Sequence, residues 1–123
     1  MQIRIARPAR DLERTAAFYR LLEFPALASF EDHDGYSGVV FGLPDSSRQL
    51  ELVQHEGDPP SPTSEDQLVL YLGSAESVRQ FSGRIRAAGF EPRPASNPYW
   101  ERNGTVCFVD PDGYWLILSP DAW

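Results

Sequence analysis

Cysteine, histidine and long apolar segments are all scarce in this 123-residue sequence. The one cysteine, Cys107, has no second cysteine with which to form an internal disulfide or a metal-binding cluster. No apolar run approaches the roughly 18 residues that a membrane span needs, and the first residues lack the apolar core of a signal peptide. We therefore expect a cytoplasmic protein that does not enter a membrane and that folds without disulfides as one domain.

Basic side chains are also fewer than acidic ones, with eleven Lys and Arg residues against eighteen Asp and Glu residues and a formal net charge of −7. A protein that binds nucleic acid needs a basic face for the phosphates, so nucleic acid is not an expected partner. An acidic surface attracts cationic ligands. The alternative interpretation is that this charge only keeps a small protein soluble.

The sequence contains an internal repeat, which indicates two copies of one module. Three pairs of segments match at separations of 67, 66 and 66 residues: VVFGLPD at 39–45 with VCFVDPD at 106–112, LEL at 50–52 with LIL at 116–118, and LLEFPAL at 21–27 with AAGFEPR at 87–93. Residues 55–65, HEGDPPSPTSE, are rich in Pro, Ser and Asp and predict a linker. We therefore predict a single domain at 1–123, with a first module at 1–54 and a second at 66–123.

Each module is predicted to fold as a strand, a helix and three further strands. Ile3 and Ile5 alternate with Arg4 as in a half-buried strand. Apolar residues then recur at helical spacing in both modules: Leu12, Ala16, Tyr19 and Leu22 in the first, and Val78, Phe81, Ile85 and Ala88 in the second. The other predicted strands lie near 26–30, 37–42, 49–54, 67–72, 91–94, 104–109 and 114–119.

Local signals predict where these elements begin and end. Asp11 and Ser74 are candidate N-caps for the two helices, and Gly89 stands at the position after the second helix that favours glycine. The segment DPDG at 110–113 has Pro at the second position and Gly at the fourth, which is typical of a type I turn.

Strand alternation assigns residues to the two faces of each predicted sheet. A group of aliphatic residues should lie under the helices, namely Ile3, Ile5, Leu50, Leu52, Leu68, Leu70, Leu72, Leu116 and Leu118. The opposite faces then carry Arg4, Glu51, Val53, Gln67, Val69, Tyr71, Trp115 and Ile117. One helix cannot cover both faces of a sheet, so the modules are expected to close their uncovered faces into a cup. The predicted fold class is α+β, with two tandem βαβββ modules forming a cup-shaped mixed sheet.

This duplicated pattern, together with DLERTAAFYRLLEF at 11–24 and VDPDGYWLIL at 109–118, resembles the vicinal oxygen chelate superfamily. That superfamily includes glyoxalase I, extradiol dioxygenases and bleomycin-resistance proteins. More narrowly, four segments resemble its YycE-like subgroup: RIARP, DHDGYSGVVFGLP, LELVQHEG and NPYW. One departure is Glu23, where the first helix of superfamily members often ends in Gly. A left-handed backbone there would cost roughly 1 kcal/mol without glycine.

The resemblance also implies where a metal would be held. Superfamily enzymes bind a divalent metal with one ligand from each of four strands, usually His, Glu or Gln, and these positions fall on Arg4, Glu51, Gln67 and Ile117. The alignment to these positions is firm for Glu51 and Ile117. For Arg4 and Gln67 an alignment shifted by one residue is an alternative. Arg carries a fixed positive charge without a lone pair, and Ile has no donor atom. Two remaining donors are fewer than the three protein ligands of a catalytic zinc site, so we expect no metal and no cofactor.

Arg4 and Glu51 are expected to form an ion pair at the centre of the cup, with the guanidinium in the space of the missing cation. The alternative is an ordinary buried pair that fixes sheet register and binds nothing. Removing one partner of a buried pair typically costs about 3–5 kcal/mol.

The segment NPYWERNG at 97–104 is expected to form a loop over the mouth of the second module's cup. Tyr99, Trp100, Trp115 and Tyr71 would then provide flat aromatic surface for a planar or cationic ligand, and Ile117 would line the wall. The alternative is that these aromatics pack the loop down or fill a dimer interface, which we expect of Tyr99 rather than of Trp100.

His33 lies in the segment EDHDGYSG at 31–38, which is typical of a hairpin connection and lacks the spaced oxygens of a calcium loop. Nearby carboxylates could favour the protonated imidazole, which gives His33 a candidate role at the edge of the cup. Serine-triad, phosphate-loop and Cys–His nucleophile sites are excluded, because their motifs are absent.

The sequence and the resemblance together predict a small-molecule binding protein of the glyoxalase/bleomycin-resistance type that lacks the usual metal site. No catalytic residue is assigned, and the ligand is expected to be cationic or planar. The predicted ligand-binding residues are Arg4, Glu51, Gln67, Tyr71, Trp100, Trp115, Ile117 and His33. The resemblance also implies a homodimer. Two alternatives remain: a metal-dependent lyase, isomerase or dioxygenase with a slipped ligand alignment, and an interaction domain without a small ligand.

Overall fold

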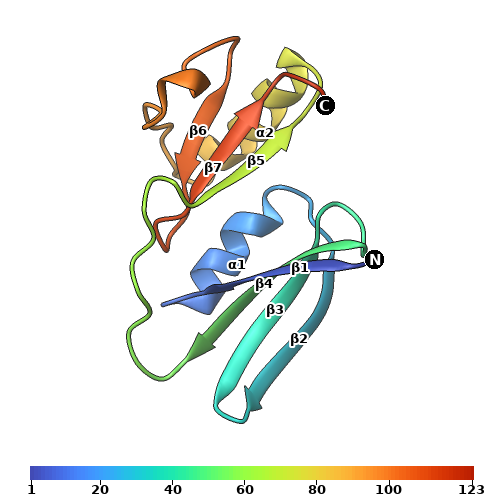
Figure 1. Cartoon of the computed structure of the whole chain (residues 1–123), viewed down its shortest axis with the longest axis vertical. Coiled ribbons are helices and arrows are strands. Elements are labelled where there is room, and N and C mark those ends of the chain that lie inside the picture. The colour runs from blue at the N-terminus through green and yellow to red at the C-terminus, as the bar shows by residue number, and fades with distance from the viewer. The chain divides into compact units, whose positions relative to one another are not determined.

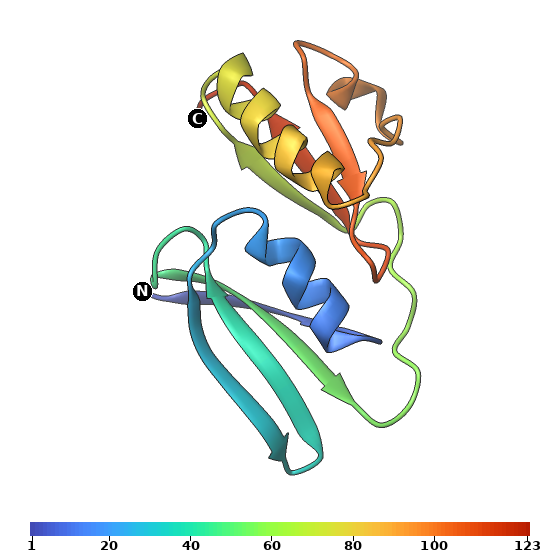
Figure 2. The same ribbon diagram turned by 180° about the vertical axis from the view of Figure 1, so that it is seen from behind.

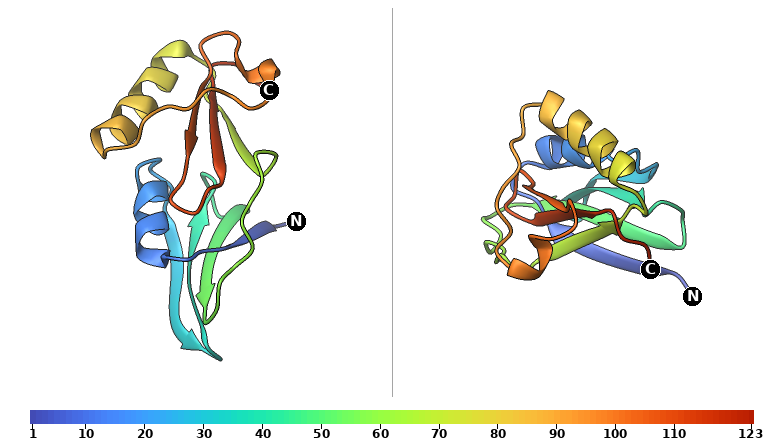
Figure 3. Two further views of the ribbon diagram at one scale, coloured as in Figure 1. Left: turned by 90° about the vertical axis from the view of Figure 1, so that its left-hand side faces the viewer. Right: turned by 90° about the horizontal axis from the view of Figure 1, so that it is seen from above.

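A computed structural model describes all 123 residues and divides them into two compact units, Met1–Pro60 and Ser61–Trp123 (Figure 1). The boundary lies within residues 55–65, and no helix or strand forms between His55 and Gln67. In each unit one long helix packs on one face of one sheet (Figures 2 and 3). Neither helix combines the length and the hydrophobicity that crossing a bilayer requires.

The first unit has the predicted strand–helix–three-strand order. Its elements are β1 (Ile3–Pro8), α1 (Leu12–Arg20), β2 (Ala26–His33), β3 (Tyr36–Gly42) and β4 (Arg48–His55). The strands form one sheet in the order β1-β4-β3-β2, in which β1 runs parallel to β4 and the other neighbours are antiparallel. β1 and β2 are therefore the two edges of this sheet.

The sequence signals at the ends of α1 are confirmed. The Asp11 carboxylate accepts a hydrogen bond from the Arg14 backbone N–H at 3.2 Å, as an N-cap does. Ala16, Tyr19 and Leu22 are buried, as their spacing predicts. Glu23 has a φ of 60°, so a non-glycine residue takes the left-handed backbone that ends this helix.

The second unit repeats this order with one strand fewer. It contains β5 (Gln67–Tyr71), α2 (Ala75–Ala87), the short 3₁₀ helix η1 (Pro98–Trp100), β6 (Val106–Val109) and β7 (Trp115–Ser119). The sheet order is β5-β7-β6, with β5 parallel to β7 and β6 antiparallel to it.

The strand predicted at 91–94 does not form. Only Arg93 bridges to the neighbouring strand, where its backbone N–H donates to the Cys107 carbonyl at 2.8 Å. Pro92 and Pro94 flank it, and proline has no N–H to donate to a strand ladder. Most of the outer edge of β6 is therefore left without a neighbouring strand, and the cavity described below lies beside it.

The ends of α2 agree with the sequence prediction, but its buried face differs. The Ser74 hydroxyl accepts from the Ser77 backbone N–H at 3.1 Å, and Gly89 has a φ of 96°. Val78 and Ile85 are buried as predicted, but the third buried side chain is Ser82. Phe81 is only half-buried, because the helix presents the i, i+4, i+7 row to the sheet instead of the i, i+3, i+7 row.

The turn at 110–113 forms as predicted. The Gly113 N–H donates to the Asp110 carbonyl at 3.0 Å, and the Asp110 carboxylate accepts from the backbone N–H groups of Asp112 and Tyr114 at 2.8 and 3.0 Å. This turn fixes the antiparallel register of β6 and β7.

The predicted helix-covered faces are confirmed in the sheet centres but not on β1. Leu50, Leu52, Leu116 and Leu118 are buried, whereas Ile3 and Ile5 remain 52% and 48% exposed. The prediction was wrong for these two because α1 packs mainly on β3 and β4 and does not cover the edge strand. The buried side chain of β1 is Arg7, which donates to the Tyr19 hydroxyl at 3.2 Å. Three further leucines, Leu68, Leu70 and Leu72, are half-buried.

Candidate functional site

The predicted ion pair on the uncovered face of the first sheet is present. Arg4 Nη1 lies 3.0 Å from Glu51 Oε2, and Arg4 Nε donates to Gln49 Oε1 at 2.9 Å. The pair is not buried as expected, because the Arg4 side chain is 51% exposed on an edge strand while that of Glu51 is 17% exposed. Such a pair contributes about 0–1 kcal/mol to stability, well below the value for a buried pair.

Equivalent strand pairs in the two units have equivalent registers. In the first unit Arg4 lies opposite Gln49, and Ala6 opposite Glu51. In the second unit Gln67 lies opposite Trp115, and Val69 opposite Ile117. Arg4 and Gln67 thus hold the same place in their own sheets, as do Glu51 and Ile117, which agrees with the alignment of the sequence repeat.

Both the oxygen and the nitrogen of the Gln67 side-chain amide form hydrogen bonds within the second unit. Its oxygen accepts from the indole N–H of Trp100 at 3.1 Å, and its nitrogen donates to the Ser64 carbonyl at 2.9 Å. These two bonds hold the amide in one orientation and direct its oxygen at the indole. Gln67 therefore anchors the aromatic segment to β5.

Trp100 is buried, which corrects the prediction of an open stacking surface. It is 9% exposed and forms an apolar cluster with Cys107 and Ile117, against which Val69 and Trp115 pack. The Asn97 side chain caps η1 by accepting from the Tyr99 N–H at 3.0 Å, and the hydrogen bond to the distant residue Gln67 holds the indole against the sheet. Ile117 is fully buried in the same cluster and presents no open wall.

The exposed aromatic surface of the second unit is made by other rings. Tyr99, expected to pack the loop down, is 51% exposed, and Tyr71 is 40% exposed. Their ring centroids lie 4.8 and 6.4 Å from that of Trp100, and Trp123, which the sequence analysis did not single out, lies 5.9 Å from Tyr71. The predicted residue Trp115 is half-buried on the same side of the sheet.

His33 does not join the Arg4–Glu51 pair. It is the last residue of β2, which forms the opposite edge of the sheet from β1. Its exposed ring makes an edge-on contact with Phe30 at 6.4 Å. The hairpin beyond it is made by Asp34 and Gly35, with φ values of 53° and 85°.

The residues at the four metal-ligand positions do not suit a divalent cation. Arg4 brings a positive charge that is already paired with Glu51, Ile117 has no donor atom, and the oxygen of Gln67 accepts from Trp100. The structure also contains no group of three or more His, Cys, Asp and Glu side chains that could hold a metal ion.

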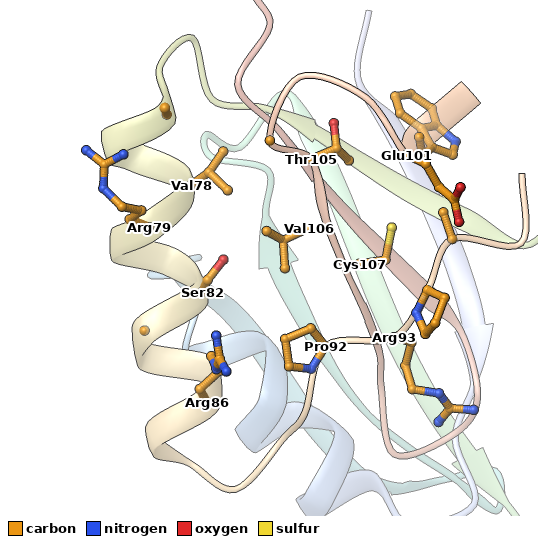
Figure 4. Close-up of a pocket in the computed structure, with 16 residues that line it drawn as sticks. Val78, Arg79, Ser82, Arg86, Pro92, Arg93, Glu101, Thr105, Val106 and Cys107 are labelled. Carbon is orange, nitrogen blue, oxygen red and sulfur yellow. The ribbon is translucent and has the colours of Figure 1, made fainter. Parts of the chain in front are cut away.

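A cavity of about 560 Å³ in the second unit was not predicted from the sequence (Figure 4). It lies between α2, the segment 92–95 and β6, at the sheet edge that the missing strand leaves open. Ser82, Arg86, Val106 and Cys107 are among the residues that line it. Two sequence signals could have indicated it: a serine on the apolar face of a helix, and prolines within a predicted strand.

The thiol of Cys107 lies at this cavity and is 3% exposed. Burial raises the pKa of the Cys107 thiol above its ordinary value, and the negative charge of Glu101 raises it further. Both effects favour the protonated thiol, which is the less nucleophilic form of cysteine.

Comparison with known proteins gives matches along almost the whole chain. Residues 3–53 match the YycE-like N-terminal domain, and residues 65–119 match the YycE-like C-terminal domain. An uncharacterized protein YycE of Bacillus subtilis (strain 168) is 37% identical in an alignment of 120 positions that covers 95% of this chain and 86% of that protein.

Two crystal structures illustrate the structural likeness. One is a YycE protein of unknown function from Bacillus subtilis, provisionally assigned to the glyoxalase/fosfomycin resistance proteins, with a TM-score of 0.92 at 35% identity over 99% of this chain and 90% of that one. The other is a mutant of the fosfomycin resistance protein FosX of Listeria monocytogenes, in complex with Mn(II) and 1S,2S-dihydroxypropylphosphonic acid. It has a TM-score of 0.75 at 20% identity over 97% of this chain and 90% of that one, and it shows the fold alone.

The strand order, the repeat and these matches agree, and the chain belongs to the YycE-like family and has the glyoxalase/bleomycin-resistance fold of the vicinal oxygen chelate superfamily.

Proposed function

We propose that this protein binds a small molecule without the divalent metal that enzymes of its superfamily use. The observation that supports this most directly is the 3.0 Å ion pair between Arg4 and Glu51, at strand positions where such enzymes carry metal ligands. The guanidinium supplies a permanent positive charge next to the carboxylate, so Glu51 has no need of a metal cation.

The second unit supports the same proposal. The position equivalent to Arg4 is Gln67, whose amide is held by Trp100 and Ser64, and the position equivalent to Glu51 is Ile117, which is buried. In our proposal these residues form a fixed support for the exposed rings of Tyr71 and Tyr99.

The ligand in this proposal is planar or cationic. Exposed aromatic faces attract flat molecules by stacking and cations through the ring quadrupole. A net charge of −7 would add long-range attraction for a cation. The proposal also includes a cytoplasmic location and a homodimer. The Mn(II) bound by FosX belongs to a protein 20% identical to this chain, so it is not transferred here.

Two measurements test the proposal. Elemental analysis of the purified protein should find no stoichiometric transition metal. N-methylquinolinium, a planar aromatic cation, should quench tryptophan fluorescence saturably, and Tyr71→Ala should weaken its binding about 5–10-fold, as loss of one cation–π contact does.

Tyr36→Ala is the matched control, since Tyr36 is also a half-exposed tyrosine, at 45%, but lies in the first unit on β3. It should leave the affinity for N-methylquinolinium unchanged. A stoichiometric metal ion in the purified protein would contradict the metal-independent part of the proposal. Equal affinities of the Tyr71→Ala variant and the wild type would contradict the aromatic site.

A further inference from the structure

We propose that the cavity beside α2 is a second binding site, for a small organic anion with an apolar body and an oxyanion head. The head would be bound by Ser82 and Arg86, and the body would lie against the apolar wall of the cavity. This site is separate from the Arg4–Glu51 pair and from the exposed tyrosines, because none of them lines the cavity.

The first observation that supports this site is the buried hydroxyl of Ser82. Ser82 is 8% exposed, and its hydroxyl is buried without any hydrogen-bond partner. A buried hydroxyl that makes no hydrogen bond costs about 1–3 kcal/mol, so natural proteins rarely keep one without a use for it. Ser82 lies on the inner face of α2 and its hydroxyl is directed from the helix toward β6, across the cavity (Figure 4). A ligand atom in the cavity would give this hydroxyl its missing partner.

The second observation that supports this site is the positive charge around the cavity. Three of the eleven cationic side chains of the protein, those of Arg79, Arg86 and Arg93, line it, against the single carboxylate of Glu101. None of these three guanidinium groups forms an ion pair or a hydrogen bond within the protein. The charge around the cavity is therefore positive, although the net charge of the whole chain is −7. A positive cavity attracts anions.

Arg86 is the arginine best placed to bind the head of the ligand. It stands four residues after Ser82, so the two side chains lie on the same face of α2, one turn apart. Arg79 and Arg93 point outward from the cavity in Figure 4, and they contribute positive potential at its rim. A guanidinium binds carboxylate and phosphoryl oxygens through two parallel hydrogen bonds, and a neighbouring hydroxyl can donate a third.

The remaining lining residues suit an apolar body. Val78 on α2 and Val106 on β6 face the cavity from opposite sides, and Pro92, Ala95 and Trp100 continue the apolar surface. A volume of about 560 Å³ is within the range of small-ligand pockets. Glu101 lies across the cavity from Ser82 and Arg86, where it does not oppose the bound oxyanion (Figure 4).

The test uses three ligands that share one aromatic body and differ in their charged group. Isothermal titration calorimetry of the full-length protein would compare phenylacetate, benzylphosphonate and phenethylammonium. Both anions should bind saturably, and excess phenethylammonium should change their affinities less than about twofold, because a cation that binds the exposed tyrosines is not attracted into a positive cavity. The ratio of the two anion affinities then shows whether the site prefers a carboxylate or a phosphonate head.

Three variants assign the binding to its residues. Arg86→Gln should weaken anion binding about tenfold, and Ser82→Ala should weaken it about threefold to tenfold through loss of one hydrogen bond. Ser82→Ala should meanwhile leave the midpoint of urea unfolding unchanged or higher, because it removes a buried hydroxyl that has no partner. Loss of affinity without loss of stability is the signature of a binding residue.

Arg84→Gln is the matched control, because it removes the same charge from the same helix at a residue that does not line the cavity and instead covers the Phe81 ring at 4.4 Å. It should change anion affinity less than twofold. Three outcomes would overturn the proposal: no saturable binding of either anion, displacement of the bound anions by phenethylammonium, or unchanged anion affinity in both Ser82→Ala and Arg86→Gln.

Discussion

Cys107 shows at the residue scale how burial controls a side chain that could otherwise react. Its thiol is 3% exposed among Trp100 and Ile117, and both burial and the charge of Glu101 favour the protonated form. Thiolates are the nucleophilic form of cysteine, so a raised pKa lowers the reactive fraction at any pH below it.

We predict that iodoacetamide alkylates Cys107 far more slowly in the folded protein than in the protein unfolded in urea. At pH 8 the difference should exceed about tenfold, since burial reduces both the thiolate fraction and reagent access. The pH at which the folded protein reaches half its maximal rate should lie above 9.0, the ordinary pKa of the group. Mass spectrometry of timed samples measures both rates.

The raised pKa of Cys107 also makes the stability of the folded protein decrease at high pH. Because the folded state holds the thiol proton more tightly than the unfolded state, the contribution of Cys107 is fully present below pH 9.0 and is lost as pH rises through the higher pKa of the folded state. Glu101→Gln should increase the alkylation rate of the folded protein, whereas Glu91→Gln should not. Equal rates in folded and unfolded protein would contradict the burial of the thiol.

Individual residues also show which contacts the sequence could predict. The ion pair of Arg4 with Glu51 was predicted and is present, because strand alternation puts both side chains on one face and the family resemblance implies that their positions meet. The burial of Trp100 was not predicted, because it depends on a hydrogen bond to Gln67, which is 33 residues away along the chain.

At the element scale, α2 combines good caps with a glycine in its interior. Gly83 lies in the middle of Ala75–Ala87, and a Cβ built on it would have no atom within 4 Å. Glycine in a helix interior costs about 0.8–1.0 kcal/mol relative to alanine, because the unfolded chain gains freedom and no side chain compensates. Nothing in the packing of this helix requires glycine at that position.

Gly83→Ala is therefore predicted to increase the free energy of unfolding by about 1 kcal/mol, measured by urea denaturation followed by circular dichroism. Gly73→Ala serves as the contrast, since Gly73 has a φ of 75° and alanine there should destabilise the protein by about 1 kcal/mol. A destabilising effect of Gly83→Ala would mean that the helix does not have the described surroundings.

A second feature at the element scale is the strand that was predicted at 91–94 and does not form. The repeat of the first module predicts a strand here, but two prolines remove backbone donors and leave one bridge at Arg93. The result is an open edge on β6 and room for the cavity. The first unit has a full strand β2 at the equivalent place, so the two halves of the repeat differ where the cavity lies.

At the scale of the whole molecule, edge strand β1 leaves apolar side chains exposed. Ile3 and Ile5 are about half exposed on a strand that has a neighbour on one side only. Exposed apolar residues on a free strand edge are typical of surfaces that pair with another chain. They support the proposed homodimer.

We predict that light scattering will give a mass of twice 13.8 kDa for the protein in solution. Replacing Ile5 with Lys on this edge should shift the mass toward the monomer, because a buried unpaired charge opposes association. Leu27→Lys is the matched control, since Leu27 is 40% exposed on β2, at the other edge of the same sheet. A monomeric mass at all protein concentrations would contradict the dimer.

The sequence by itself determined the duplicated α+β fold, the helix caps, the turn at 110–113 and the pairing of Arg4 with Glu51. The fold, the caps and the turn follow from the repeat, periodicity and capping chemistry, whereas the pairing of Arg4 with Glu51 is implied by the resemblance to the superfamily. Only the tertiary structure decided that Trp100 is buried, that Ser82 faces the sheet and that a cavity opens beside β6. These features depend on which segments meet in space; the serine on α2 and the prolines at 92 and 94 are local signals, but they do not by themselves show that a cavity forms.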